Sequence, residues 1–191
     1  MNSEHYHLPV GQKLPAEERQ LLIELQNGAP GAFEKLFHRY WRMIMRLCLA
    51  RLENTADAED VAIETFTAAA QGIKKFRGDS RLSTWLYRIC LNRIARQKQK
   101  IARTPPAVPI ENCPEDAATS EPDQTPPAIA RLRQALADLP EKDRTVLILH
   151  YLEELRPGEI AAILGLKPSA VTMRLRRAEA RLRQAYERRQ R

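Results

Sequence analysis

The stretch that decides the fold of this 191-residue chain is Leu155-Arg-Pro-Gly-Glu-Ile-Ala-Ala-Ile-Leu-Gly-Leu-Lys-Pro-Ser-Ala-Val-Thr-Met-Arg-Leu-Arg-Arg-Ala178. Pro157 and Pro168 each suit the first position of a helix, where the missing backbone N–H is no loss. Gly165 lies between them and supplies the conformational freedom that a tight turn needs. The stretch therefore predicts a short helix, a glycine turn and a second helix, which is the layout of a helix-turn-helix.

The second helix of this stretch has an apolar face and a polar face. Its apolar residues fall at steps of four, three and four: Val171, Leu175, Ala178 and Leu182. This spacing is typical of a helix held down along one stripe. The other arc carries the candidate base readers, which are Ser169, Thr172, Met173, Arg174, Arg176 and Arg177. Arginine can bond guanine edges or phosphates. Arginines that only keep the protein soluble are the alternative, but the preceding helix and glycine turn favour DNA reading.

Charge is distributed unevenly along the chain, whose formal net charge is +7. Residues 72–103 hold ten Lys or Arg against Asp79 alone, and residues 167–191 hold nine against two acids. Residues 104–128 hold five acids and no base. Two basic blocks around an acidic spacer indicate a polyanionic partner. Nucleic acid fits better than a membrane, because no apolar run approaches the roughly 20 residues that span a bilayer.

The cysteines and histidines indicate neither redox nor metal chemistry. Cys48, Cys90 and Cys113 are odd in number and widely spaced, which argues against a disulfide framework and a metal site. The four histidines share no ligand spacing. We therefore expect no metal and no cofactor. The amino terminus lacks the basic-then-apolar layout of a signal peptide, so we expect a cytoplasmic protein.

Helical periodicity on both sides of a proline-rich spacer predicts an all-α protein with two small helical domains. Seven of the thirteen prolines fall within residues 104–128, which is typical of a flexible, Pro-rich acidic linker. The flanking apolar residues recur at three and four positions, and strand-like alternation is almost absent. We predict a tail at residues 1–15, a helical domain at 16–103, the linker at 104–128, and a domain at 129–191 that contains the helix-turn-helix.

Four helices are expected in the first of these domains. They begin near Pro15, Gly31, Asn54 or Thr55, and Leu82, and the last ends near Arg103. The third starts with several acids, which suit the positive end of a helix dipole. Trp85 lies on the apolar stripe of the fourth, so core packing is a better interpretation of it than base stacking.

Three motifs, in their order and spacing, resemble the extracytoplasmic-function sigma factors, the smallest class of bacterial transcription initiation factors. The motifs are Asp57-Ala-Glu-Asp-Val61 with Glu64 and Phe66, then Phe76-Arg-Gly-Asp-Ser-Arg-Leu-Ser-Thr-Trp-Leu-Tyr-Arg-Ile-Cys-Leu-Asn92, and Leu139-Pro-Glu-Lys-Asp-Arg144. The similarity covers roughly residues 16–187. It implies a sigma-2 bundle, a sigma-4 helix-turn-helix domain, and a subunit without catalytic residues that directs core RNA polymerase to promoter DNA.

In that family the acidic helix of sigma-2 docks on the largest polymerase subunit. The resemblance therefore implies that Asp57, Asp60, Glu64 and Phe66 bind polymerase. Placement at a helix start also explains Asp57 without any partner, whereas Glu64 lies beyond the first turn. The resemblance further implies a regulatory anti-sigma factor, often membrane-anchored. For the acidic linker, a path toward the RNA exit and a plain spacer are equally good interpretations.

The loop that begins at Phe76 resembles the family's device for opening the minus-10 promoter element. There a base leaves the stack for a protein pocket while cations hold the backbone. Implied contacts to the minus-10 strand are Phe76, Arg77, Asp79, Ser80, Arg81, Arg88, Asn92 and Arg93. The base readers named above are implied to enter the major groove of the minus-35 element. Many members have Gly-Thr-Val, a basic residue and Ser where this chain has Ser169-Ala-Val-Thr-Met173, which leaves the promoter sequence open.

Two other functions compete with this interpretation. A stand-alone helix-turn-helix regulator with a sensor or dimerisation bundle would not need the block from Phe76 to Asn92. A small helical nucleic-acid hydrolase is disfavoured, because the acids gather at one helix start and no nucleophile with its base is recognisable.

Overall fold

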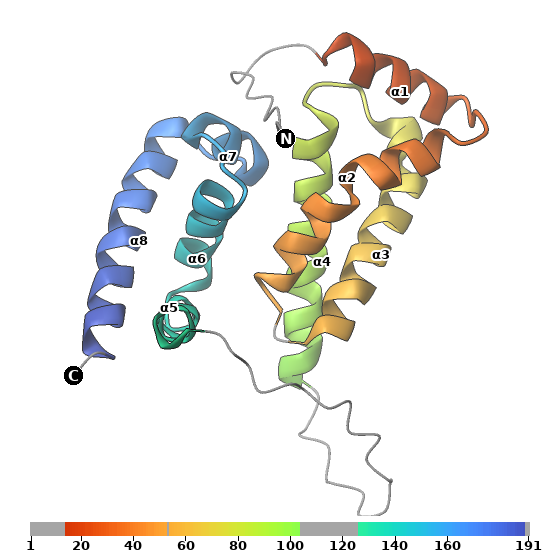
Figure 1. The fold of residues 1–191 in the computed structure, drawn as a ribbon. Helices are drawn as coiled ribbons and strands as arrows, with labels where there is room; N and C mark the ends of the chain where they lie inside the picture. Colours follow the sequence, from red (N-terminus) through yellow and green to blue (C-terminus); the bar gives the residue numbers. More distant parts are fainter. Residues whose placement is uncertain (1–13, 53, 104–125, 190–191) are drawn as a thin grey trace, which may run out of the picture.

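Helices make up the regular structure of the part of the chain that the computed structural model describes, residues 14–52, 54–103 and 126–189 (Figure 1). The first group comprises α1 (Ala16–Gln26), α2 (Ala32–Leu49), α3 (Thr55–Gly72), the short 3-10 helix η1 (Ile73–Lys75) and α4 (Leu82–Arg103). The second group comprises α5 (Pro127–Ala137), α6 (Glu141–Leu147), the π-helical turn η2 (Ile148–Leu152), α7 (Pro157–Leu164) and α8 (Pro168–Arg188). The prediction of an all-α fold is confirmed.

The first group is a bundle in which α2, α3 and α4 run side by side and α1 lies across one end (Figure 1). Its core consists of side chains with at most 2% exposure that come from three helices, including Leu36, Ile44, Phe66, Leu86 and Ile94. Burying a side chain of this size stabilises the fold by about 1.5–3 kcal/mol. The third helix begins as expected, because Asn54 accepts a 2.8 Å hydrogen bond from the amide of Ala56.

The second group is a smaller bundle, in which α8 packs against α5, α6 and α7. The predicted stripe of α8 is buried at Val171, Leu175 and Ala178, and Leu182 is partly buried. Pro157 and Pro168 are the first residues of α7 and α8. Gly165 ends α7 with a φ of 66°, a left-handed conformation that glycine adopts without strain. The helix-turn-helix prediction is therefore correct in its helix boundaries.

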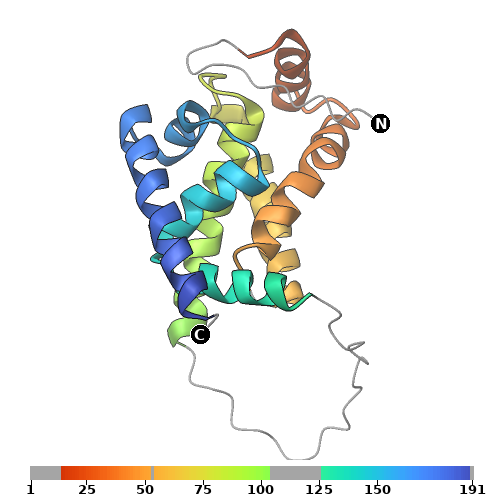
Figure 2. The same ribbon diagram turned by 60° about the vertical axis from the view of Figure 1, so that its left-hand side comes forward.

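The two bundles lie against each other, with α7 packed on α4 (Figure 2). Most of the predicted tail and linker, with Cys113, lies outside the described residues. The helix α5 starts at Pro127, within the last two residues of the range assigned to the linker from composition. Proline favours the first position of a helix, and composition alone does not indicate that Pro127 begins one.

Candidate functional site

The first half of α8 carries the predicted base readers on its outer face. Ser169, Thr172, Met173, Arg176 and Arg177 are exposed, and Arg174 is half-buried. The Thr172 hydroxyl donates a 3.1 Å hydrogen bond to the carbonyl of Pro168, which directs it back along its own helix. Met173 is 51% exposed, which is high for a large apolar side chain. Two exposed guanidinium groups and an exposed methionine are therefore available on this face for contact with a partner molecule.

The second predicted DNA surface is the loop between η1 and α4. Phe76 is partly buried and stacks on Trp85, with ring centroids 4.8 Å apart and planes 23° apart. Arg77 and Asp79 are exposed, and Gly78 between them has a φ of 75°. Trp85 is partly buried against the core, in agreement with the sequence interpretation, but it also supports Phe76. In this conformation the aromatic ring expected to face DNA is held by a second ring.

Ser80 and Arg81 complete the loop and are half-buried, whereas Arg88 and Asn92 are exposed on successive turns of α4. The guanidinium group of Arg88 donates to the carbonyl of Ala162 in α7, with its Nε at 3.1 Å. A predicted minus-10 contact is thus engaged by the helix-turn-helix bundle. Sequence patterns within one helix give no sign of such a contact.

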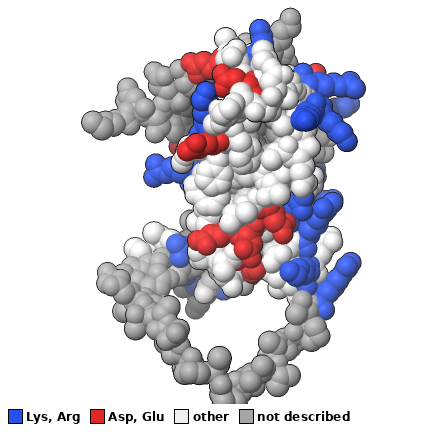
Figure 3. Space-filling model, turned by 90° about the vertical axis from the view of Figure 1, so that its right-hand side faces the viewer, with Lys and Arg blue, Asp and Glu red and all other residues white. Residues whose placement is uncertain are grey.

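The acidic face of α3 carries the predicted polymerase contacts. Asp60 and Glu64 are exposed, and Glu64 pairs at 3.4 Å with Arg93 of α4. Asp57 is half-buried and accepts a 2.7 Å hydrogen bond from Gln97. Figure 3 shows acidic side chains gathered toward the lower end of the face on which α3 lies, where α3 begins in Figure 1.

Phe66 is the one member of the predicted polymerase set that does not reach the surface. It is 2% exposed and packs in an aromatic cluster, with its ring centroid 4.9 Å from Phe37 and 6.1 Å from Trp41. Phe33 joins the same cluster at 6.5 Å and is 38% exposed. Phe66 therefore packs between α3 and α2, and its ring is covered in this structure.

A buried carboxylate joins the two bundles. Glu153, which follows η2, has a side chain only 1% exposed. It accepts hydrogen bonds of 3.2 and 2.9 Å from Arg46 of α2 and one of 2.7 Å from the hydroxyl of Tyr87 in α4. Burial, together with the negative charge of Glu153, raises the pKa of Tyr87 above its ordinary value, so this phenol stays a donor. All three hydrogen bonds cross from one bundle to the other.

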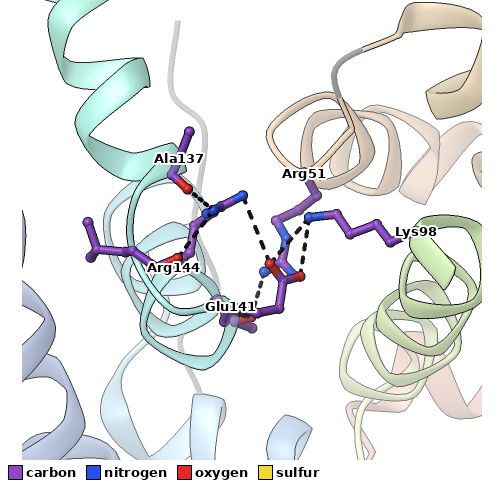
Figure 4. A network of polar contacts seen from close by, with 7 residues as sticks. Arg51, Lys98, Ala137, Glu141 and Arg144 are labelled. Carbon is purple, nitrogen blue, oxygen red and sulfur yellow. Dashed lines mark hydrogen bonds and ion pairs between the residues drawn. The ribbon is translucent and has the colours of Figure 1, made fainter. Parts of the chain in front are cut away.

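A second polar network crosses the same interface (Figure 4). Glu141 at the start of α6 pairs with Arg51 and lies 3.3 Å from the ammonium of Lys98. Arg51 is 6% exposed and also donates a 2.5 Å hydrogen bond to the hydroxyl of Thr145. Burial acts to raise the pKa of Glu141, but the charges of Arg51 and Lys98 outweigh it and hold the pKa below its ordinary value.

Sequence reasoning missed the residues of this interface. Glu141 was noticed only as part of a family motif, and Arg46, Tyr87 and Glu153 were not singled out. The backbone is unusual at this point, because η2 is a π-helical turn and Glu154, a residue other than glycine, has a positive φ of 53°. Both features often mark functional sites. They are visible only in the structure and not in the sequence.

Within the described ranges, no group of three or more metal-ligating side chains comes together, and no helix is long and apolar enough to cross a membrane. Cys48 and Cys90 are buried, with sulfur atoms 3.5 Å apart. The hydrogen bond with Cys48, together with burial, raises the pKa of Cys90 well above its ordinary value. Thiols in such surroundings are packed and poorly reactive.

The helix-turn-helix of the second bundle, together with the basic and acidic surfaces of the first, is the composition of a two-bundle protein that binds DNA. Comparison with known proteins makes the class specific. The family model for sigma-70 region 2 matches residues 36–104, and that for sigma-70 region 4 matches residues 129–182. Over 175 residues the chain is 33% identical to the RNA polymerase sigma-H factor of Pseudomonas aeruginosa, covering 85% of this chain and 90% of that protein.

Other relatives give the same result. Identity is 33% over 182 residues to the extracytoplasmic-function sigma factor SigW of Bacillus subtilis, covering 86% of this chain and 94% of SigW. The solved structure of CnrH with the cytosolic domain of CnrY has a TM-score of 0.68 at 24% identity, covering 89% of this chain and 97% of that one. RpoE with the anti-sigma factor NepR, from Bartonella quintana, has a TM-score of 0.61 at 20% identity, covering 82% and 98%.

This chain belongs to the extracytoplasmic-function family of RNA polymerase sigma factors, which are promoter-specific transcription initiation factors. The two low-identity structures support the fold alone, whereas the curated relatives carry the family assignment.

Proposed function

We propose that this sigma factor reads a minus-35 element with α8, opens the minus-10 element with the loop from Phe76 to Arg81 and the outer face of α4, and docks on core RNA polymerase through α3. The division into a sigma-2 domain at residues 16–103 and a sigma-4 domain at 129–191 belongs to the same proposal. The observation that carries it is the presence of two separate cationic surfaces on two bundles, one of them a helix-turn-helix.

Reading of the upstream element is supported by the exposed face of α8. Arg176 and Arg177 lie in the half of α8 that follows the turn, where recognition helices contact base edges. Because a guanidinium group can bond the two acceptors of guanine together, each such contact discriminates by about 1–3 kcal/mol. The apolar stripe beneath holds this face in place.

Opening of the downstream element is supported by the chemistry of the loop. Unstacking a base costs a few kcal/mol, and stacking on an aromatic ring returns about 1–3 kcal/mol. Phe76 and Trp85 offer stacked aromatic faces, and Arg77 lies exposed beside them. Arg88 and Arg93 lie further along α4, where they would contact phosphates of the DNA backbone. Asn92, Asp79 and Ser80 add hydrogen-bonding groups for base edges.

Docking on polymerase is supported by the exposed carboxylates Asp60 and Glu64, which are four residues apart and so share one face of α3. Acids on one helix face suit a partner surface of opposite charge. We propose that Asp57 contributes at the margin and that Phe66 acts by supporting the aromatic cluster.

Both promoter elements can be engaged at once only if the bundles separate. Their centres are about 25 base pairs apart, roughly 85 Å at 3.4 Å per base pair. A compact chain of this length has a radius of gyration of about 16 Å. The contacts that Glu153 and Glu141 make between the bundles must therefore be released on the promoter. The hydrogen bond from Arg88 to the carbonyl of Ala162 must be released with them.

An anti-sigma factor, of the kind that is often membrane-anchored in this family, is the regulator that we propose for this chain. Support comes from the structural neighbours CnrH and RpoE, which were solved as complexes, RpoE with an anti-sigma factor. The bundles of the present chain offer the same fold to such a partner.

Selection of DNA from a random library tests the proposal. The library is presented to this protein with core RNA polymerase, to the protein alone and to core polymerase alone, and bound fragments are sequenced. We expect a motif of two separated parts to be recovered only when protein and polymerase are together. Recovery of a one-part motif by the protein alone, unchanged by polymerase, would instead indicate a stand-alone regulator.

A further inference from the structure

The helix α1 lies along the loop proposed to open DNA, although no part of α1 belongs to a predicted DNA or polymerase surface. Figure 1 shows the loop between α3 and α4 passing beside α1 at one end of the bundle. Glu18, Leu22 and Gln26 are spaced four residues apart and so share one face of α1. Each of the three contacts a different part of the loop.

Gln26 holds the beginning of the loop. Its side-chain amide donates hydrogen bonds of 3.2 Å to the carbonyl of Ile73 and 2.8 Å to the carbonyl of Phe76. The second bond fixes the backbone at the residue whose ring is proposed to face DNA. Gln26 thus joins the last turn of α1 to both ends of the segment from Ile73 to Phe76.

Leu22 lies against the middle of the loop. A methyl group placed on the Cα of Gly78 would be 3.5 Å from a methyl carbon of Leu22, so the backbone of Gly78 runs close to this side chain. With a φ of 75°, Gly78 turns the chain there. The apolar contact sets how far the turn can move toward α1.

Glu18 holds the end of the loop. It is 5% exposed, and its carboxylate accepts a 2.9 Å hydrogen bond from the amide of Leu82, the first residue of α4. A carboxylate at this position satisfies a free N–H of the helix start and interacts favourably with the helix dipole. Its burial is offset by this bond, and substituents that cannot accept leave the start of α4 uncapped.

We propose that α1 positions the promoter-opening loop, with Gln26 and Glu18 as positioning residues that set the place of Phe76 and of the start of α4. This inference rests on the proposed function of the loop. It predicts that base preference in the downstream promoter element depends on a helix that does not touch DNA.

The first test is hydrogen exchange of the full-length protein, read at the amides of Phe76 and Leu82. Gln26→Met keeps the length of the side chain and removes both donors, and Gln20→Met changes an exposed glutamine of the same helix. The amide of Phe76 donates a 3.1 Å hydrogen bond to the carbonyl of Ile73, inside the segment that Gln26 holds, so its exchange reports whether that segment opens. We expect exchange at Phe76 to rise about tenfold in Gln26→Met, and to stay at the wild-type rate in Gln20→Met. At position 18, Glu18→Gln keeps an acceptor and should protect Leu82, whereas Glu18→Met should not.

The second test is DNA selection by the polymerase holoenzyme formed with each variant. For Gln26→Met we expect base preference in the downstream part of the motif to weaken while the upstream part and affinity for core polymerase stay as in wild type. A purely structural role would weaken both parts alike.

The results separate the two proposals. Wild-type exchange at Phe76 in Gln26→Met, or a rise spread over α2 and α3, would overturn the positioning role. The exchange measurement needs neither polymerase nor DNA, so it decides whether α1 holds the loop even if the wild-type holoenzyme selects no promoter motif. That latter result would count against the proposed function itself.

Discussion

Removing the carboxylate of Glu153 should open the molecule. Glu153 lies in the second bundle, yet its hydrogen-bond partners Arg46 and Tyr87 lie in the first. Substitution by alanine therefore deletes contacts between the bundles and spares the contacts within each. The perturbation acts on the closed arrangement rather than on folding of either part.

The size of the effect follows from the exposure of the two partners. Arg46 is 52% exposed and can be hydrated again, so its pair contributes at the low end, about 1 kcal/mol. Tyr87 is 3% exposed, and a buried hydroxyl left without an acceptor costs about 1–3 kcal/mol. Separation of the bundles relieves that cost. The closed state should lose about 2–4 kcal/mol, which is roughly a 30- to 700-fold change in the equilibrium between closed and open forms.

Small-angle X-ray scattering of Glu153→Ala and wild type measures this change as an increase in the radius of gyration. Glu187→Ala is a matched control, because Glu187 is an exposed glutamate of the same bundle in α8. Circular dichroism verifies that helix content is kept. An unchanged radius in Glu153→Ala, or an equal increase in Glu187→Ala, would refute the view that Glu153 holds the bundles together.

Four further predictions follow from the described contacts. Asp60→Arg should weaken binding to core polymerase in a fluorescence anisotropy titration, whereas Glu187→Arg, with the same change of charge, should not; equal affinities would remove Asp60 from the docking surface. Arg177→Ala should lower affinity for the selected upstream duplex by about 1–3 kcal/mol at one base position, while Arg183→Ala should act alike on all sequences; a uniform loss for Arg177→Ala would make it a phosphate contact. The pKa of Glu141 is held below its ordinary value of 4.5, so its contribution to the closed state is present above pH 4.5 and is lost as the pH falls through the lowered pKa; scattering should show opening on acidification, and a Glu141→Gln protein with the same acid dependence would contradict this. Cys48 and Cys90 should resist alkylation at pH 8 in the folded protein, because both are buried and the pKa of Cys90 is raised, and rapid labelling detected by mass spectrometry would show that the core opens there.

The fold could be predicted largely because local signals agreed with each other. Proline at helix starts, the Asn54 cap and the four-three-four spacing of Val171, Leu175, Ala178 and Leu182 each act within a few residues, and each is found in the structure. Such signals depend on backbone and side-chain preferences that neighbouring residues already determine.

The candidate site could be predicted only in part, because its arrangement depends on contacts far apart in the sequence. The partners of Glu153 are 107 and 66 residues away, and Gln26 reaches 50 residues to Phe76. Phe66 shows the opposite limitation. Its place in the motif suggested a contact, whereas three-dimensional packing covers it. The sites on α3, α4 and α8 remain predictions until polymerase and DNA are present.

Run-off transcription with core RNA polymerase, with and without this protein, on the promoter fragments recovered by selection tests the central claim most directly. We predict transcripts only when the protein is present, loss of these transcripts when either part of the two-part motif is altered, and reactivity of thymines in the downstream part to permanganate. Binding of the protein to the fragments without any protein-dependent transcript would contradict the account.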